Sequence, residues 1–227
     1  PSGLSGSAPW ARVARGRKKG GSGTLEHARP VPSGLPLPPL LREIRRAEPE
    51  AQITILMAVG SHRATTREEM VEKFGADVVA SERFINHDPH DPSILTRLDP
   101  LPSGGELWLN RMALEADLLV ADGFIEPHQF AGFSGGRKSI MPGIAGLQTV
   151  LASHNAEFTV HPQARSGNLE GNPFQTDMLN AARQAGLAFI LNVALDAEKK
   201  VSAAFAGDFE AAHLAGCRYV TNRCAVT

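Results

Sequence analysis

The segment Ile53-Thr-Ile-Leu-Met-Ala-Val-Gly-Ser-His-Arg63 decides the fold class of this chain. Its first seven residues are mostly apolar and are β-branched at one end, which is typical of a short buried strand. Gly60 begins a turn, and one of the two threonines at 65–66 can cap a following helix, with a glutamate at 68–69 closing a capping box. A buried strand that passes through a turn into a helix is the repeating unit of α/β folds.

The same alternation continues along the chain. Further strands are expected at residues 76–80, 117–121, 187–193 and 201–205. Helices are expected at residues 40–47, 106–115, 147–154, 173–185 and 209–215. The prolines and glycines of residues 84–105 indicate that this stretch is mostly loop. The whole pattern predicts a Rossmann-like α/β fold, with a largely parallel sheet and flanking helices.

Composition narrows the possible classes of function. Apolar residues make up 42% of the chain, enough for a core, and the net charge is −1. This balance, with 6% aromatic residues, gives no reason to expect a nucleic acid or a membrane as partner. The longest apolar stretch, residues 53–59, is far too short to span a bilayer. Cys217 and Cys224 have no metal partners at useful spacing, and so few cysteines favour a cytoplasmic location.

The first 24 residues differ from the rest of the chain. They begin with Pro1, carry a basic cluster between Arg12 and Lys19, and then run through Gly-Gly-Ser-Gly. A transit peptide would explain these features, and a start that is missing or altered explains them equally well; we favour the second interpretation. We therefore expect residues 1–28 to be irregular and residues 29–227 to form the α/β domain.

Two histidines follow predicted strands. His62 comes after the strand that ends at residue 59, and His128 comes after the strand that ends near residue 121. Ligands of parallel sheets bind beyond the carboxyl ends of the strands, so both loops are expected to open on one edge. Two histidines that face one pocket can protonate and deprotonate opposite faces of a substrate. For any one of the eight histidines, a surface or hydrogen-bonded core position is nevertheless the commoner outcome.

The glycine-rich stretch Gly132-Phe-Ser-Gly-Gly-Arg-Lys-Ser139 invites comparison with a phosphate loop. The Walker pattern needs a glycine immediately before the lysine, and Arg137 occupies that place. Gly135 and Gly136 can still let backbone N–H groups approach a phosphate, with Arg137 or Lys138 adding charge. A plain glycine loop with a solvated basic pair explains the stretch equally well. A loop lysine such as Lys138 can also be a point of covalent attachment.

His154 lies near the end of a predicted helix and is a poor metal site by spacing alone. His161 is seven residues further on, which does not place the two on one helical face. No HExxH, CxxC or paired-carboxylate motif is present. The residues by themselves therefore predict an α/β domain with a histidine- and glycine-rich site at one edge of the sheet.

Several motifs taken together resemble the lactate racemase family. They are Gly60-Ser-His-Arg-Ala-Thr-Thr-Arg-Glu-Glu69, Asn86-His-Asp88, Gly123-Phe-Ile-Glu-Pro-His128, the block from Gly132 to Gly146, His154-Asn155, Gly171-Asn-Pro173 and Phe189-Ile-Leu-Asn192. The similarity runs from about Arg29 to His213, and the glycine block after the histidine is its most specific part.

The resemblance implies a nickel-pincer nucleotide as cofactor, built on a pyridinium ring. It implies that Lys138 is joined covalently to this group, that His154 is the protein ligand to nickel, and that His62 and His128 are the acid/base pair. Arg29 falls on the arginine that fixes the substrate carboxylate, a task suited to its forked donors. The pincer supplies the remaining donors of a roughly square-planar site, which nickel favours.

The activity implied is racemisation of a 2-hydroxy acid, with lactate as the default substrate. A hydride leaves the substrate for the pincer ring and returns to the other face, while the two histidines exchange the hydroxyl proton. Enzymes that make the cofactor are the implied partners.

The sequence departs from the family pattern in two places. A strand followed by Asp-Asp-x-Thr-Arg-Pro is usual, but here Gly-Gly-Ser-Gly precedes Arg29, so the strand is expected to be missing. Family members are also nearly twice as long, so their second α/β domain is expected to be absent.

Two other functions are compatible with these features. The chain can be a fragment that binds cofactor or metal without turnover, which the expected absence of a second domain favours. A zinc hydrolase of the same fold class is a third possibility, but the sequence lacks its ligand set.

Overall fold

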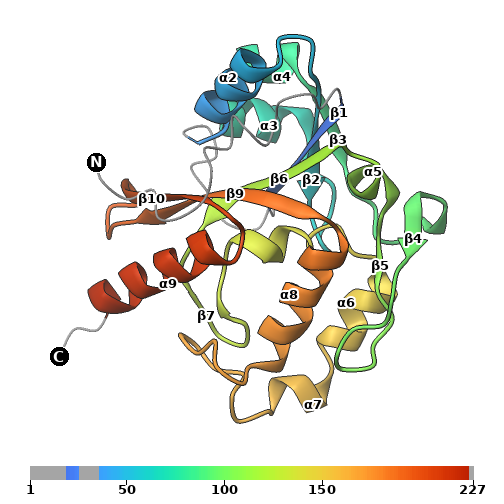
Figure 1. Cartoon of the computed structure of the whole chain (residues 1–227), viewed down its shortest axis with the longest axis vertical. Helices are drawn as coiled ribbons and strands as arrows, with labels where there is room; N and C mark the ends of the chain where they lie inside the picture. Colours follow the sequence, from blue (N-terminus) through green and yellow to red (C-terminus); the bar gives the residue numbers. More distant parts are fainter. Residues whose placement is uncertain (1–18, 26–35, 225–227) are drawn as a thin grey trace.

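Six strands form the main sheet in the order β10-β9-β6-β1-β2-β3 in the computed structural model, which describes residues 19–25 and 36–224 (Figure 1). The strands are β1 (Lys19–Leu25), β2 (Gln52–Ala58), β3 (Arg83–Asn86), β6 (Leu118–Phe124), β9 (Leu187–Leu195) and β10 (Val201–Gly207). All pairs from β3 across to β9 are parallel, and β10 pairs antiparallel with β9 at the edge. The predicted α/β class with a largely parallel sheet is confirmed.

Strand β1 corrects the expectation for the start of the chain. Residues 19–25 were expected to lack a strand, yet they pair in parallel with β2 along their whole length and with β6 from Gly20 to Gly23. The tendency of a residue to form a strand depends strongly on its surroundings. Here β2 and β6 supply backbone hydrogen-bond partners on both sides, and this pairing outweighs the low strand propensity of the glycines. The rest of residues 1–28 lies outside the described part.

Three helices cover one face of the sheet: α2 (Leu37–Ala47), α3 (Arg67–Phe74) and α4 (Ala76–Ser81) (Figure 1). Helix α3 begins with the predicted capping box, formed by Thr66 and Glu69. Helix α4 corrects the prediction of a strand at residues 76–80. Its two adjacent valines suggested a strand, but Gly75, at φ 90°, ends α3 and lets the chain turn into a second short helix. Val79 then packs into the core shared with β2.

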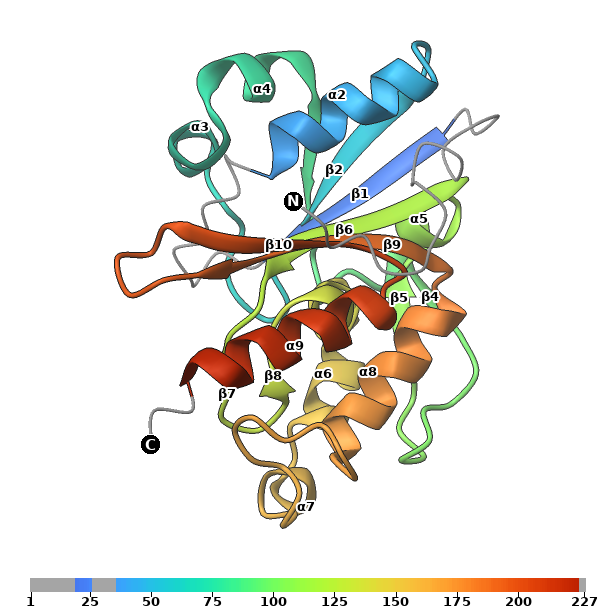
Figure 2. The ribbon, with the colours of Figure 1, turned by 60° about the vertical axis from the view of Figure 1, so that its left-hand side comes forward.

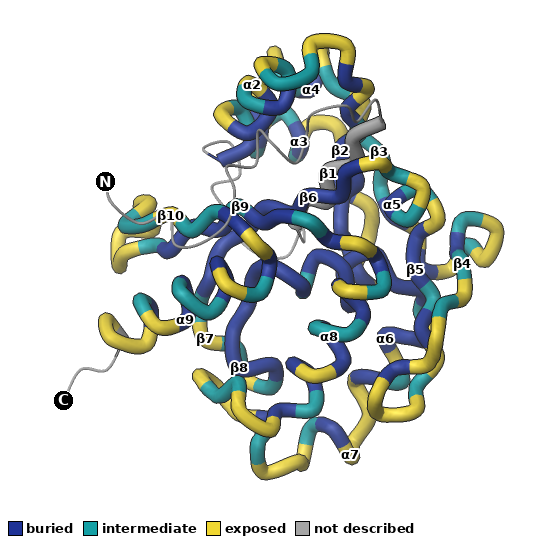
Figure 3. The backbone as a smooth tube through the Cα atoms, in the orientation of Figure 1, coloured by how far each residue is buried: buried dark blue, intermediate teal, exposed yellow. Residues whose placement is uncertain are grey.

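The other face is covered by α6 (Leu147–Ser153), α8 (Pro173–Gln184) and α9 (Ala211–Cys224) (Figure 2). Strand β6 lies between the two helical layers and is buried along its whole length (Figure 3). The larger core cluster joins β6 to α8 through Leu119, Ala121 and Met178. The sheet therefore separates two apolar cores, as the largely apolar sequences of β2, β6 and β9 predict.

Residues 83–115 differ most from the prediction. In place of loop followed by helix, they form β3, the 3-10 turn η1 (Pro92–Ile94), a hairpin-like pair β4 (Leu95–Arg97) and β5 (Trp108–Asn110), and the short α5 (Arg111–Leu114). The helix begins only at Arg111 because Asn110 caps it, accepting a hydrogen bond from the N–H of Met112. A long-range pairing of strands thus replaced the local helical preference.

Short elements after β6 build the edge that carries the site. They are β7 (Pro127–His128), β8 (Gly132–Phe133), the 3-10 turn η2 (Gly136–Ser139) and α7 (Ala156–Thr159). β7 and β8 pair antiparallel, so residues 129–131 form the tip of a hairpin. This hairpin and η2 lie on the same side of the sheet as α6 and α8 (Figure 2).

Candidate active site

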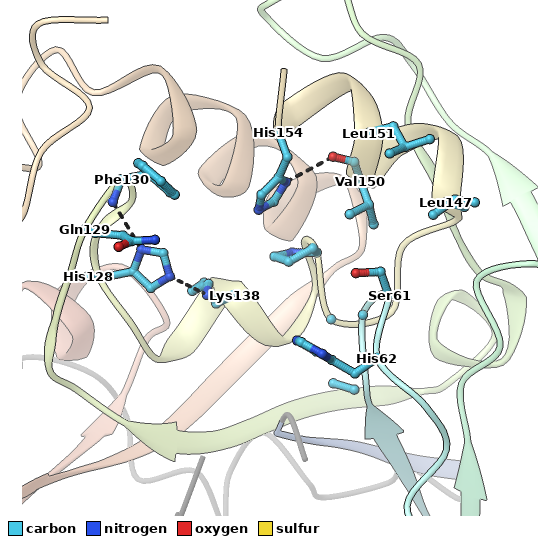
Figure 4. Close-up of a pocket in the computed structure, with 14 residues that line it drawn as sticks. Ser61, His62, His128, Gln129, Phe130, Lys138, Leu147, Val150, Leu151 and His154 are labelled. Carbon is cyan, nitrogen blue, oxygen red and sulfur yellow. Dashed lines mark hydrogen bonds between the residues drawn. The ribbon is translucent and has the colours of Figure 1, made fainter. Parts of the chain in front are cut away.

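A cavity of about 360 Å³ lies beyond the carboxyl end of β2. His62, His128, Lys138 and His154 all line it, although they are spread over 93 positions of the chain (Figure 4). The other lining residues come from the end of β2, the tip of the hairpin, the turn after η2, and α6: Ala58, Gly60, Ser61, Gln129, Phe130, Pro142, Gly143, Leu147, Val150 and Leu151. The cavity is at the edge where parallel sheets bind their ligands.

His62 enters the cavity from the turn that follows β2. Gly60 takes φ 58°, a left-handed conformation that glycine adopts without strain, and its N–H donates to the carbonyl of Gly143 at 2.9 Å. The N–H of His62 donates to the carbonyl of Val59 at 3.0 Å, which closes the turn. The turn therefore holds the exposed imidazole of His62 beside the segment that follows η2.

His128 stands at the end of β7, and its ring is held by backbone amides. Nδ1 accepts hydrogen bonds from the N–H of Phe130 at 3.3 Å and of Ala131 at 3.2 Å. Nε2 points the other way and lies 3.2 Å from Nζ of Lys138 (Figure 4). The half-buried ring thus has one nitrogen in the hairpin and one directed at the lysine.

Lys138 is one of three consecutive polar residues in η2 that face different surroundings. Its half-buried side chain reaches the cavity, whereas the side chains of Arg137 and Ser139 are buried in the interior. The turn is fixed by the N–H of Lys138 donating to the carbonyl of Gly135 at 3.2 Å, and by the carbonyl of Lys138 accepting from Gly143 at 3.0 Å. A tight turn of this kind separates neighbouring side chains, so one charged group is presented and the other enclosed.

His154 caps the carboxyl end of α6, and its ring is exposed. Nδ1 lies 3.0 Å from the carbonyl oxygen of Val150 and 3.0 Å from Oγ of Ser153. A carbonyl can only accept a hydrogen bond, so Nδ1 carries the proton in this contact and Nε2 keeps its lone pair. The edge of the ring also packs on Phe174, with 5.6 Å between ring centroids.

Gly135, Gly136 and Arg137 are not among the residues that line the cavity. A Cβ on Gly135 would lie 2.6 Å from Nδ2 of Asn192, and one on Gly136 would lie 3.2 Å from the ring of His213. Arg137 is 4% exposed, and burial lowers its pKa. Because they lack a Cβ, Gly135 and Gly136 allow the turn at η2 to pack closely against Asn192 and His213. Arg29, the predicted substrate-binding residue, lies outside the described part.

Two other histidines are core residues of the ordinary kind. His87 donates from Nε2 to the carbonyl of Ala145 at 2.9 Å, and burial lowers its pKa. His213 donates from Nε2 to the carbonyl of Ser134 at 2.9 Å, and burial, helped by the charge of Arg137, lowers its pKa to about 3. Sγ of Cys217 lies 3.5 Å from Nδ1 of His213, and burial raises the pKa of that thiol to about 12.

Two residues that support the hairpin were not predicted as part of the site. Asn172, the N-cap of α8, and Gln175, in the first turn of that helix, donate hydrogen bonds to backbone carbonyls beside His128. The Asn-Pro pair at 172–173 is a recognisable helix start, so it could have located the cap but not its second contact. No local sequence pattern indicates that Gln175 contacts the hairpin.

The described residues contain no group of three or more His, Cys, Asp or Glu side chains placed to hold a metal ion. Across the same residues, no helix is both long enough and apolar enough to cross a membrane.

Comparison with known proteins gives consistent results. Residues 6–167 match the family model described as the lactate racemase N-terminal domain. A lactate racemase of Thermoanaerobacterium thermosaccharolyticum is 54% identical over 209 residues, which are 92% of this chain and 49% of that protein. A lactate racemase of Lactiplantibacillus plantarum is 50% identical over 215 residues, 95% of this chain and 51% of that protein. The chain spans about half the length of the curated relatives it matches.

The fold also matches solved structures. The lactate racemase apoprotein of Thermoanaerobacterium thermosaccharolyticum superposes with a TM-score of 0.93 at 52% identity, covering 95% of this chain and 52% of that one. A Thermotoga maritima protein superposes with a TM-score of 0.72 at 23% identity over 91% of this chain, which shows a shared fold alone.

Proposed function

This chain belongs to the lactate racemase N-terminal domain family, and from that premise we propose that it takes part in racemising a small 2-hydroxy acid, with lactate as the default substrate. The observation that carries the proposal is the cavity that brings together His62, His128, Lys138 and His154. Two titratable rings reach this cavity from loops after different strands, as a reaction on two faces of one carbon requires.

The described residues fit a nickel-pincer nucleotide. A histidine that binds a metal usually donates its other ring N–H to a backbone carbonyl or carboxylate, which orients the ring. His154 does so toward Val150, and Nε2 would be the nitrogen that binds nickel. Lys138 offers a primary amine at the same cavity for covalent attachment. Since such a cofactor would bring most of the donors itself, one protein ligand would be sufficient for nickel.

The roles of the remaining side chains follow from their positions. When bound, the nickel-pincer nucleotide would supply the acceptor for the hydride that leaves the substrate α-carbon. His62 and His128 would hold and move the hydroxyl proton, one on each side of the substrate. The apolar side chains of Leu147 and Val150, which line the cavity, would limit the access of water.

Three further assignments belong to the same proposal. Arg29 would bind the substrate carboxylate, since its forked donors match that group. Gly135, Gly136 and Arg137 would act toward the cofactor by shaping η2, the turn that presents Lys138. Residues 29–227 would form the cofactor- and substrate-binding domain, and the enzymes that make the cofactor would be its partners.

The test is racemisation by chain produced together with the cofactor-making enzymes. L-lactate is incubated with the loaded chain in D2O, and the products are separated by chiral chromatography and analysed by mass spectrometry. The proposal predicts D-lactate that keeps protium at the α-carbon, because a transferred hydride does not exchange with solvent. D-lactate carrying deuterium there would mean proton abstraction and would reject the proposed chemistry.

A second candidate function is binding of the cofactor or metal without turnover. It is favoured by the coverage, because the chain spans only about half of its curated relatives. The same preparation distinguishes the two functions. Nickel and a covalent adduct without any D-lactate would support binding alone.

A further inference from the structure

The first turn of α8 holds the hairpin tip next to His128 through two buried amide side chains. Asn172, fully buried, donates from Nδ2 to the carbonyl of Phe130 at 2.9 Å. Gln175, 5% exposed, donates from Nε2 to the carbonyl of Ala131. Both carbonyls belong to residues 130–131, so the helix fixes two consecutive peptide groups of the tip.

The orientation of both amides is determined by their other partners. Oδ1 of Asn172 accepts from the N–H of Phe174 at 3.0 Å, as the cap of α8. Oε1 of Gln175 accepts from Nε and Nη2 of Arg137 at 2.9 and 2.6 Å. A backbone N–H and a guanidinium can only donate, so the nitrogen of each amide is the atom that faces the hairpin carbonyl.

The same two residues of the tip hold the ring of His128. The N–H groups of Phe130 and Ala131 both donate to Nδ1. A backbone N–H can only donate a hydrogen bond, so Nδ1 is the acceptor and carries no proton. In the neutral ring the proton is therefore on Nε2. The side of these residues that faces α8 and the side that faces His128 are therefore fixed together.

We infer that Asn172 and Gln175 are positioning residues that hold residues 130–131 so that their two N–H groups keep His128 in the Nε2–H tautomer, directed at Lys138. Through Arg137, Gln175 also ties this hairpin to η2, the turn that presents Lys138. One buried side chain thereby sets the relative placement of the two functional groups. The tautomer is a property of the chain before cofactor or substrate binds, whereas its importance for racemisation rests on the proposed function.

The tautomer has a consequence for both partners of the contact. Nε2 of His128 lies 3.2 Å from Nζ of Lys138. An ammonium can only donate, so a hydrogen bond from Nε2–H to Nζ requires the lysine to be a neutral amine. The neutral amine is also the nucleophilic form. The neutral ring of His128 therefore directs an Nε2–H donor into the cavity. To accept a proton at Nε2 it must first give up its contacts with the two hairpin amides.

The test is the tautomer of His128 in cofactor-free chain, read from long-range ¹H–¹⁵N NMR spectra of ring-labelled protein at alkaline pH. His128→Gln assigns the signals by their loss. The wild-type chain is expected to show a pyrrole-type Nε2 and a pyridine-type Nδ1. Asn172→Asp and Gln175→Glu keep the acceptor oxygens but lose the donors to the hairpin, and both are expected to shift the ring toward a mixture of tautomers.

Asn180→Asp is the matched control, because it makes the same chemical change on α8 at a residue that contacts Gln184 instead of the hairpin. Amide hydrogen exchange at Phe130 and Ala131 is followed in parallel, and is expected to accelerate in the two test variants only. A wild-type ring protonated at Nδ1 would overturn the inference. So would folded Asn172→Asp and Gln175→Glu variants that keep the wild-type tautomer. Neither result depends on racemase activity.

Discussion

His128 and His154 line the same cavity, but the backbone holds them in opposite ways. Two hairpin N–H groups point at Nδ1 of His128, whereas the helix carbonyl of Val150 faces Nδ1 of His154. The first arrangement leaves an Nε2–H in the cavity, and the second leaves a lone pair there. A hairpin tip presents N–H groups and the end of a helix presents carbonyls, so the local secondary structure decides which imidazole turns an N–H toward the cavity and which turns a lone pair toward it.

The largest expected difference between His154 and His128 is in the nickel content of their alanine variants. His154→Ala removes the lone pair that we propose as the protein ligand, and is expected to lose nearly all the nickel while the adduct on Lys138 remains. His128→Ala is expected to keep both. The measurement is the ratio of nickel to covalent adduct in purified loaded protein. His161→Ala is the control, and an unchanged ratio in His154→Ala would move the ligand elsewhere, with His161 the next candidate.

The rate of racemisation is expected to depend on the two histidines that we propose as the acid/base pair. His128→Gln and His62→Gln are each expected to slow racemisation by ~10²–10⁴-fold while nickel content stays at the wild-type level, because each removes an acid/base group. The initial rate of D-lactate formation is compared at equal nickel occupancy. A rate within tenfold of wild type for either variant would remove that histidine from the acid/base pair.

A third histidine shows what full burial does to the same side chain. His213 has its pKa lowered to about 3, while an unfolded histidine titrates near ~6.5. Between these values the unfolded chain binds a proton that the folded chain does not, so this residue makes wild-type stability fall as the pH drops below ~6.5. His213→Gln can keep a donor for the Ser134 carbonyl and cannot titrate.

The expected result is that His213→Gln gains stability relative to wild type as the pH falls from 7 to 4, by ~2–4 kcal/mol. Asp122 acts in the other direction, since burial raises its pKa to about 7, so Asp122→Asn should lose stability relative to wild type over the same interval. Urea unfolding across the pH range measures both. Parallel pH curves for His213→Gln and wild type would contradict the assignment of a buried, neutral ring.

The smallest expected effect sharpens the account of His154. Oγ of Ser153 lies 3.0 Å from Nδ1 of His154 and donates to the same Val150 carbonyl at 2.9 Å. Ser153→Ala leaves the ring in place with less support, and nickel affinity is expected to fall by ~10-fold. Ser81→Ala removes a comparable hydroxyl at the end of α4 and serves as control. Equal nickel retention in both variants would show that Val150 alone orients the ring.

Local patterns predicted the parts of the fold that depend on local chemistry. The apolar runs of β2, β6 and β9, the cap of α3 and the Asn-Pro start of α8 are all recognisable in the sequence. Strand β1 was missed because its pairing is supplied by β2 and β6 and not by its own glycine-rich residues. β5 was missed for the same reason, since it is stabilised by pairing with β4.

The candidate site likewise contains residues that the sequence predicted and residues that it did not. Topology placed His62 and His128 at one edge, and the structure brings Lys138 and His154 to the same cavity. The sequence did not predict that Arg137 faces the interior, because the two sides of a 3-10 turn are distinguished only by what packs on them. Nor did it predict the amides of α8, whose partners lie more than forty positions away in the chain.

Covalent loading tests the central claim most directly, namely that this cavity is where the proposed cofactor is attached. Chain produced together with the cofactor-making enzymes is analysed by intact mass and by peptide mapping, beside Lys138→Ala and the surface control Lys199→Ala. The account predicts an added mass on the peptide that contains Lys138, retained in Lys199→Ala and lost in Lys138→Ala. An unmodified wild-type chain, or an adduct that persists in Lys138→Ala, would contradict it.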